Sequence, residues 1–180
     1  MKTYVALLRG INVGGNSKID MKLLRLCFES LGLLNVRTVI NSGNVIFASD
    51  RTDIAQLNQE IMMNLTLIFG FQIPTILRDK ETLKLICENF PMTWENNEEQ
   101  KTDILFLGEQ VDHEDIIKRM NYNPGVDTLI YLKGAIGWNI QRINYAQSGL
   151  KKLIGTSLYK QLTTRNINTV RKLSSLMGNV

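Results

Sequence analysis

The sequence predicts an α+β protein made of short strands and amphipathic helices. Residues 3–8 form an apolar run typical of a buried strand. After the polar segment that follows, residues 23–31 place apolar side chains at helical spacing behind Asp20, a residue suited to cap a helix. Residues 36–40 and 45–48 are two further short strands around a turn that contains glycine. These elements open a strand–helix–strand–strand order.

The next elements complete that order. A helix over residues 54–68 begins after Thr52 or Asp53, and a strand follows over residues 72–77. Pro74 cannot donate to a neighbouring strand, so we expect this strand at a sheet edge or at a bulge. The order βαββαβ is that of the split βαβ, or ferredoxin-like, motif. Asp79 then caps one more helix.

A similar set of elements follows an aperiodic polar connector. A strand, a short helix, a hairpin around Lys133-Gly134 and a helix capped by Ser148 predict the order βαββα. We expect a last helix to begin at Thr163 or Thr164. Two related halves are therefore indicated, although no residue-level repeat is visible. The strand, the short helix, the two hairpin strands and the capped helix are predicted over residues 103–107, 112–120, 126–132, 135–140 and 148–154. The first subdomain is predicted over residues 1–90, the connector over 91–102 and the second subdomain over 103–180.

Charge is distributed unevenly along the chain. The net charge is +4, but residues 1–19 hold three basic residues and residues 141–180 hold seven, with no acidic residue in either segment. Residues 20–140 hold 11 basic and 17 acidic residues. If the two ends meet in the fold, they form one positive surface that suits an anionic partner.

Composition excludes several classes of protein. No apolar run approaches the roughly 20 residues that cross a bilayer, and the first apolar stretch is too short for a secretory signal, so we expect a cytoplasmic protein. Cys27 and Cys87 lie on apolar helix faces and are expected to be reduced and buried. His113 is the single histidine, which excludes a Ser-His-Asp or Cys-His set and gives no metal site and no cofactor site.

The loop over residues 9–18 is the first candidate for binding. Its glycines allow several main-chain amides to point in one direction, and Arg9 and Lys18 add positive charge. Asn16 stands where a Walker A loop has lysine, so the loop is not a P-loop. A flexible glycine loop without a ligand explains the same residues.

Two further polar segments are candidates. The turn at residues 41–44 reads equally well as an ordinary hairpin turn. The segment at 163–169 is predicted to open the last helix, where free amides, the helix dipole and Arg165 would attract an anion. Capping by threonine alone is the alternative.

The three segments together resemble a known family. Residues 7–16 (LLRGINVGGN), 42–45 (SGNV) and 164–170 (TRNINTV) with Lys172-Leu173 are similar to the bacterial domain of unknown function 1697, DUF1697, over essentially the whole chain. The resemblance implies an α+β chain of two ferredoxin-like subdomains, with mainly antiparallel sheets, helices packed on one face and a C-terminal helix. It implies no activity. Ile167 stands where the family has tryptophan.

The sequence therefore predicts one site for a phosphorylated or other anionic ligand. The site would combine loop 9–18, turn 42–44 and helix start 163–169. Its residues are Arg9, Asn12, Gly14, Gly15, Lys18, Ser42, Asn44, Thr164, Arg165, Asn166 and Asn168. Whether chemistry follows binding is left open by these residues.

Two other interpretations remain. The basic C-terminal segment, with Lys151, Lys152, Lys160, Arg171 and Lys172, would serve a nucleic-acid binding module. In the other interpretation the asparagines of the three segments satisfy buried backbone groups and bind no ligand.

Overall fold

The protein folds into two compact units. The structure, a computed structural model, describes residues 1–12, 18–40 and 43–178. One unit is Met1–Thr82 with the end of the chain from Ser175, and the other is Leu83–Ser174. The division thus falls inside two helices, near Thr82 and near Ser174. The sequence-based boundaries at residues 90 and 103 stay a prediction. Among the described residues, no helix is both long and apolar enough to cross a membrane.

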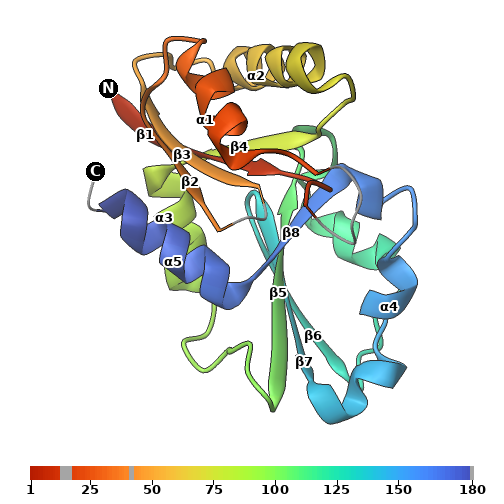
Figure 1. Ribbon diagram of the computed structural model, residues 1–180. Coiled ribbons are helices and arrows are strands. Elements are labelled where there is room, and N and C mark those ends of the chain that lie inside the picture. The colour runs from red at the N-terminus through yellow and green to blue at the C-terminus, as the bar shows by residue number, and fades with distance from the viewer. Residues whose placement is uncertain (13–17, 41–42, 179–180) are drawn as a thin grey trace. The chain divides into compact units, whose positions relative to one another are not determined.

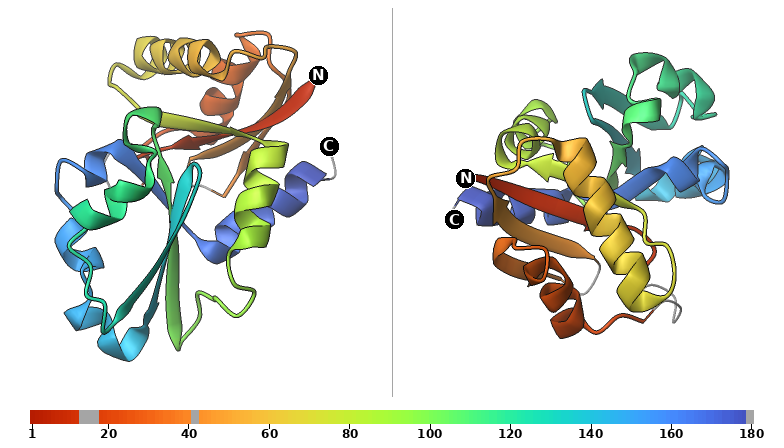
Figure 2. Two further views of the ribbon diagram at one scale, coloured as in Figure 1. Left: turned by 180° about the vertical axis from the view of Figure 1, so that it is seen from behind. Right: turned by 90° about the horizontal axis from the view of Figure 1, so that it is seen from above.

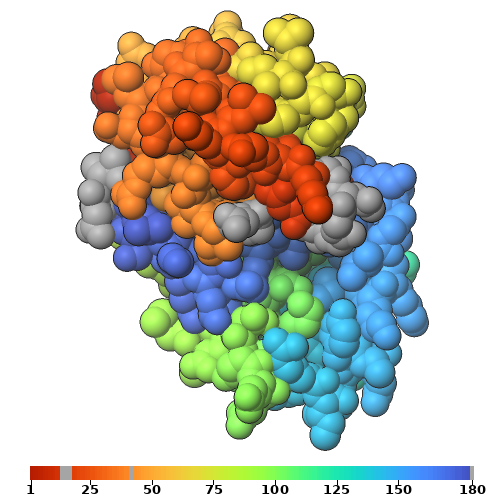
Figure 3. Space-filling view, viewed as in Figure 1, coloured from red at the N-terminus to blue at the C-terminus, as the bar shows by residue number. Residues whose placement is uncertain are grey.

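The first unit has the predicted βαββαβ order. Its elements are β1 (Lys2–Leu8), α1 (Met21–Glu29), β2 (Leu34–Val39), β3 (Asn44–Ser49), α2 (Ile54–Phe69), β4 (Thr75–Asp79) and the start of α3 (Lys80–Asn89). The strands form an antiparallel sheet in the order β2-β3-β1-β4. Helices α1 and α2 cover one face of this sheet (Figure 1) and form an outer surface of the unit (Figure 3).

Alternation along β1 builds the core of this unit. Tyr4, Ala6 and Leu8 point to the helix-covered face, where Phe28 and Ile61 pack against them. The helix starts are capped as predicted, because the Asp20 carboxylate accepts from the amides of the first turn of α1 and Asp53 does the same for α2.

Strand β4 lies at the edge of the sheet, as Pro74 predicts. The predicted bounds shift by a few residues, because β4 begins directly after Pro74 and ends at Asp79. The carboxylate of Asp79 accepts from the Thr82 amide at 2.8 Å, so the predicted cap of α3 is confirmed.

The second unit has a sheet of the same order. Its elements are the rest of α3, β5 (Gln100–Leu107), η1 (Glu109–Val111), η2 (Glu114–Arg119), β6 (Asp127–Leu132), β7 (Ala135–Gln141), η3 (Arg142–Gln147), α4 (Leu150–Leu153), η4 (Tyr159–Gln161), β8 (Leu162–Asn166) and α5 (Ile167–Gly178). The four strands are antiparallel in the order β6-β7-β5-β8. The predicted fold class, α+β with two such subdomains, is confirmed.

Both faces of the second sheet are covered. Leu105 and Trp138 face a core that includes Ile116 of η2 and Leu153 of α4. On the opposite face the missing side chain of Gly137 leaves room for the stacked rings of Phe90 and Trp94, whose centroids are 5.9 Å apart. Helices α3 and α5 lie side by side on that face (Figure 2).

The predicted start of the last helix is wrong. Residues 163–166 belong to β8, which pairs with β5, and α5 begins only at Ile167. Thr163 and Thr164 therefore belong to a paired strand and do not cap the helix. The cap of α5 is Asn166, whose Oδ1 accepts a hydrogen bond from the Thr169 amide at 2.8 Å. The helix expected over residues 112–120 is the 3₁₀ helix η2.

Candidate functional site

The residues of the predicted site come from both units. In the first unit, Gly14, Gly15 and Ser42 lie outside the described residues. Arg9 directly follows β1, and its backbone amide donates to the Pro74 carbonyl at 2.9 Å. Lys18 is exposed at the far end of the loop.

The described part of loop 9–18 is closed by an asparagine. Asn12 adopts a left-handed backbone with φ 54°. Its Oδ1 accepts from the Ile19 amide at 2.8 Å, and its Nδ2 donates to the Ile19 carbonyl at 3.2 Å. Both polar ends of the side chain therefore hold the loop together.

The hairpin turn packs on the start of the same loop. The Leu8 amide donates to the Gly43 carbonyl at 2.7 Å. A Cβ at Gly43 would come within 2.9 Å of the Leu8 carbonyl and 3.0 Å of Ile11 Cγ1. The adjacent Asn44 is fully buried, and its Nδ2 donates to the Val39 carbonyl. Two of the three predicted segments are thus in contact inside the first unit.

In the second unit, Thr164 and Arg165 lie on opposite faces of the sheet, because they are successive residues of strand β8. Thr164 pairs with Leu105 and so faces the core containing η2 and α4. Arg165 pairs with Ile104 and faces the opposite side of the sheet. Thr164 Oγ1 is buried, and it has no hydrogen-bond partner among the described residues.

Arg165 is the cation of the predicted set whose environment differs most from water. The residue is half-buried, and its Nη1 donates to the Thr164 carbonyl at 2.8 Å. Removal of the guanidinium from water lowers the pKa of Arg165 to about 10. The charge of Arg165 therefore persists at neutral pH, at a cost in solvation.

The two remaining asparagines of the set also bind the main chain. Asn166 caps α5, and Asn168 Nδ2 donates to the Asn96 carbonyl at 2.9 Å. With Asn12 and Asn44, all four asparagines of the predicted site hold backbone groups of their own unit.

The site segment of the second unit has a counterpart in the first. Arg78 pairs with Val5 in the first sheet as Arg165 pairs with Ile104 in the second. Arg78 Nη1 donates to the preceding carbonyl at 2.7 Å, as Arg165 does at 2.8 Å. Each arginine precedes an acidic or amide residue that caps the next helix through a threonine amide. The shared pattern, Arg-Asx-x-x-Thr, starts at Arg78 and at Arg165 and is visible in the sequence once the two strands are aligned.

The hairpin turns repeat in the same way. The Leu107 amide donates to the Gly134 carbonyl at 3.0 Å, as the Leu8 amide donates to Gly43. Equal strand order, equal register and repeated hydrogen bonds show that the two units repeat one structural plan.

The family model described as "Protein of unknown function (DUF1697)" matches residues 1–136. The chain belongs to the DUF1697 family. A solved structure similar to it is the conserved bacterial protein SP0830 from Streptococcus pneumoniae, with 30% identity over 98% of each chain and a TM-score of 0.85. Comparison with curated proteins gives no match. The predicted family is thus confirmed, and these similarities identify no ligand.

The residues of this DUF1697 chain that could hold a metal are not grouped. Among the described residues, no three His, Cys, Asp or Glu side chains gather as a metal site.

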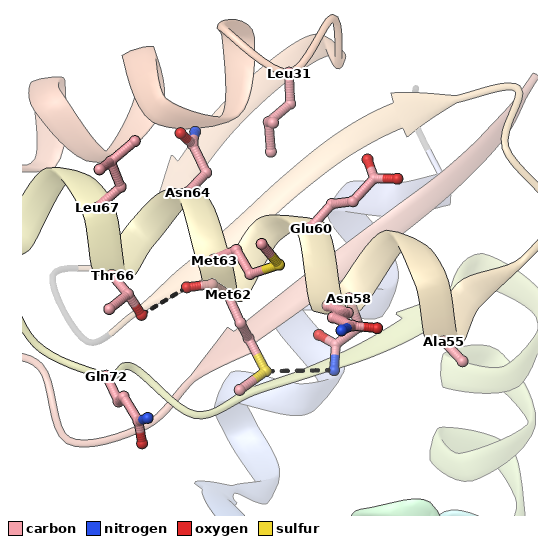
Figure 4. A pocket seen from close by; sticks show the side chains of 11 residues that line it. Leu31, Ala55, Asn58, Glu60, Met62, Met63, Asn64, Thr66, Leu67 and Gln72 are labelled. Atoms are coloured by element: carbon pink, nitrogen blue, oxygen red, sulfur yellow. Dashed lines mark hydrogen bonds between the residues drawn. The ribbon is translucent and has the colours of Figure 1, made fainter.

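The large groove over α2 in the first unit is not suited to an anion. It measures about 870 Å³, and Glu60 is the single charged residue of its lining (Figure 4). Asn64 and Leu67 line it on the α1 side of the helix, and Met62 lies on the other side.

Proposed function

We propose that this DUF1697 protein binds an anionic ligand where β8 meets α5, with Arg165 as the cationic group. The observation that carries the proposal is the placement of Arg165 on a covered sheet face, where loss of water lowers its pKa to about 10. An oxyanion bound there would form charge-assisted, bidentate hydrogen bonds with the guanidinium.

The start of α5 supports the same assignment. The first amides of a helix have no partners inside the helix. In α5 the Asn166 side chain accepts a hydrogen bond from the Thr169 amide, and it does not bind the first-turn amides of Ile167 and Asn168. Residues 141–180 contain no acidic residue that would repel an anion. Arg165 and the first amides of α5 are therefore neighbours along the chain, and an anion that contacts both would combine the two interactions.

Comparison of the two units adds a reason for choosing the second. The helix cap beside Arg78 is the carboxylate of Asp79, whereas the cap beside Arg165 is the neutral amide of Asn166. Asp103 pairs with Asn166 across the sheet, but it faces the side opposite Arg165 and forms an ion pair with Lys101 at 2.7 Å. The site in the second unit thus favours an anion, and its counterpart does not. Contributions from Arg9, Lys18 and the other first-unit residues stay a prediction.

The test uses the matched arginines. Wild type, Arg165→Gln and Arg78→Gln are titrated with inorganic pyrophosphate by calorimetry, and circular dichroism checks the fold of each variant. Both variants lose an equivalent hydrogen bond to the preceding carbonyl. We expect Arg165→Gln to weaken binding by at least about tenfold, as loss of a charge-assisted contact does, and Arg78→Gln to keep it within about twofold. Equal affinity in all three proteins, or no heat from any, contradicts the proposal.

The nucleic-acid alternative gives a different result. Lys151, Lys152, Lys160 and Lys172 are exposed, but Arg171 donates to the carbonyls of Trp94 and Pro91 and is held inside the second unit. Binding to a nucleic-acid backbone weakens with a log–log salt slope of about 0.7–0.9 per phosphate contact. A steep slope with an oligonucleotide, unchanged in Arg165→Gln, would favour that module over the anion site.

A further inference from the structure

A small pocket opens on the second unit between the end of η2 and the segment that includes α4. Figure 1 shows α4 beside the helical turns that precede β6. The pocket measures about 200 Å³, and its lining residues are Arg119, Met120, Asn121, Lys152, Leu153, Thr156, Ser157 and Leu158. Two of these residues are basic and none is acidic. Of these residues, only Lys152 is named from the sequence as a candidate for binding.

Four polar side chains at this pocket have no bonding partner among the described residues. They are the guanidinium of Arg119, the ammonium of Lys152, the amide of Asn121 and the hydroxyl of Ser157. Thr156 differs, because its hydroxyl donates to the Leu153 carbonyl and accepts from the Tyr159 amide. The four groups are available to a ligand, and each can donate a hydrogen bond.

The wall that carries Asn121 is fixed by close packing. Asn121 adopts a left-handed backbone with φ 47°. A Cβ at Gly149 would lie 2.4 Å from the Asn121 carbonyl and 2.7 Å from Tyr122 Cα, so only glycine allows this approach. Gly149 is held in turn, because its amide donates to the buried Asp127 carboxylate at 2.8 Å. The pocket is therefore built on a wall that needs no ligand to form.

The floor of the pocket is apolar. Met120, Leu153 and Leu158 are buried members of the core of the second unit. An apolar floor lowers the local dielectric, which strengthens the attraction of Arg119 and Lys152 for an anion at the rim.

We propose that this pocket binds the phosphoryl group of a ligand. Arginine and lysine together with neutral donors are the groups that recognise a tetrahedral oxyanion. Sites for whole small molecules measure about 300–1,000 Å³, so a pocket of about 200 Å³ suits one phosphoryl group, with the rest of the molecule outside. This pocket shares no residue with the Arg165 site, so each of the two proposals can be tested independently of the other.

Amide chemical shifts of the full chain, titrated with inorganic phosphate at constant ionic strength, test the site. We expect saturable shifts for amides near Asn121 and Ser157. The double variant Arg119→Ala/Lys152→Ala should weaken phosphate binding by more than about tenfold, because it removes two charge-assisted contacts.

The matched control is Lys118→Ala/Lys151→Ala. These two basic residues neighbour the pocket residues in sequence but do not line it. The control should keep phosphate affinity within about twofold. Acetate, a planar anion, should bind more weakly than phosphate in the wild type. Shifts that stay linear and spread over exposed lysines, or equal losses in both double variants, would overturn the site.

A further arm identifies the source of the phosphoryl group. Glycerol 3-phosphate is compared with inorganic phosphate under the same conditions. Tighter binding of the monoester supports a ligand that continues beyond the pocket, and equal binding supports phosphate alone. Exclusion of the monoester, with phosphate still bound, contradicts a phosphorylated ligand.

Discussion

Asp127 accepts a hydrogen bond from the indole nitrogen of Trp138 at 3.0 Å inside the second unit. The same buried carboxylate also accepts from the Ser148 hydroxyl and from the amides of Asn123 and Gly149. One side chain thus joins the start of β6, the centre of β7 and the segment before α4. Its removal would leave several buried donors without partners.

The first prediction concerns the stability of this network. Burial raises the pKa of Asp127, but hydrogen bonds from Ser148 and the other three donors outweigh burial, and the pKa lies below its usual value of 3.8. Because the folded state lowers the pKa, the stabilisation is complete above pH 3.8 and is lost as pH falls through the lower, folded value. Asp127→Asn should cost about 2–4 kcal/mol at pH 7 in urea unfolding.

The pH series is the decisive measurement for Asp127. The difference in unfolding free energy between wild type and Asp127→Asn should shrink as the pH falls below 3.8. Asp115→Asn, which changes an exposed carboxylate, should alter stability little at either pH. A difference for Asp127 that does not change with pH would contradict the assignment of this network.

The second prediction separates a structural role of Asn12 from a ligand role. Asn12→Gly keeps the left-handed backbone but removes both hydrogen bonds to Ile19. We expect faster hydrogen exchange at the Ile19 amide and a global loss of about 1 kcal/mol. Asn12→Ala adds backbone strain and should cost about 1–2 kcal/mol more. Unchanged exchange at Ile19 in Asn12→Gly would show that the side chain serves another purpose.

The sequence predicts the elements of the first unit well, because its helices carry clear caps. Asp20, Asp53 and Asp79 stand before apolar periodic segments and do cap them. The start of α5 is missed because Thr163 and Thr164 are also good caps, and pairing with β5 decides between strand and helix. A local pattern cannot reveal such a distant partner.

The candidate sites show the same limit. Arg165 can be chosen from the sequence because it lies in a conspicuous polar segment. That its side chain lies on the sheet face opposite Thr164 follows only from the pairing of β8 with β5. Arg119, Asn121 and Ser157 are scattered, and no spacing rule joins them. Alignment of the two Arg-Asx-x-x-Thr segments is the sequence signal that would have revealed the repeat.

The third prediction concerns packing beneath Phe90 and Trp94. A Cβ at Gly137 would lie 2.6 Å from an atom of each ring, and the stacked rings could move only together. Gly137→Ala should therefore cost about 1–3 kcal/mol and shift the tryptophan fluorescence. Gly108→Ala is the control, since its Cβ would meet one atom at an ordinary 3.6 Å. Similar unfolding free energies for the two variants would contradict this account of the packing.

The fourth prediction compares two glycines with nearly the same backbone conformation. Gly43 has φ 79° and Gly70, which ends α2, has φ 77°. Alanine at either position pays the left-handed penalty of about 1–2 kcal/mol. A Cβ at Gly70 meets nothing within 4 Å, whereas at Gly43 it would press on the Leu8 carbonyl and on Ile11. Gly43→Ala should therefore be less stable than Gly70→Ala by about 1–3 kcal/mol in urea unfolding.

The same two variants, Gly43→Ala and Gly70→Ala, also test whether the contact at Gly43 holds the loop that follows β1. The Gly43 carbonyl receives the Leu8 amide, so displacement of the turn should expose that amide and loosen the chain just before Arg9. Hydrogen exchange at Leu8 should rise in Gly43→Ala and stay unchanged in Gly70→Ala. Equal stability of the two variants would mean that the turn moves away from Leu8 without cost, and the contact between these two segments would then have no role in holding the loop.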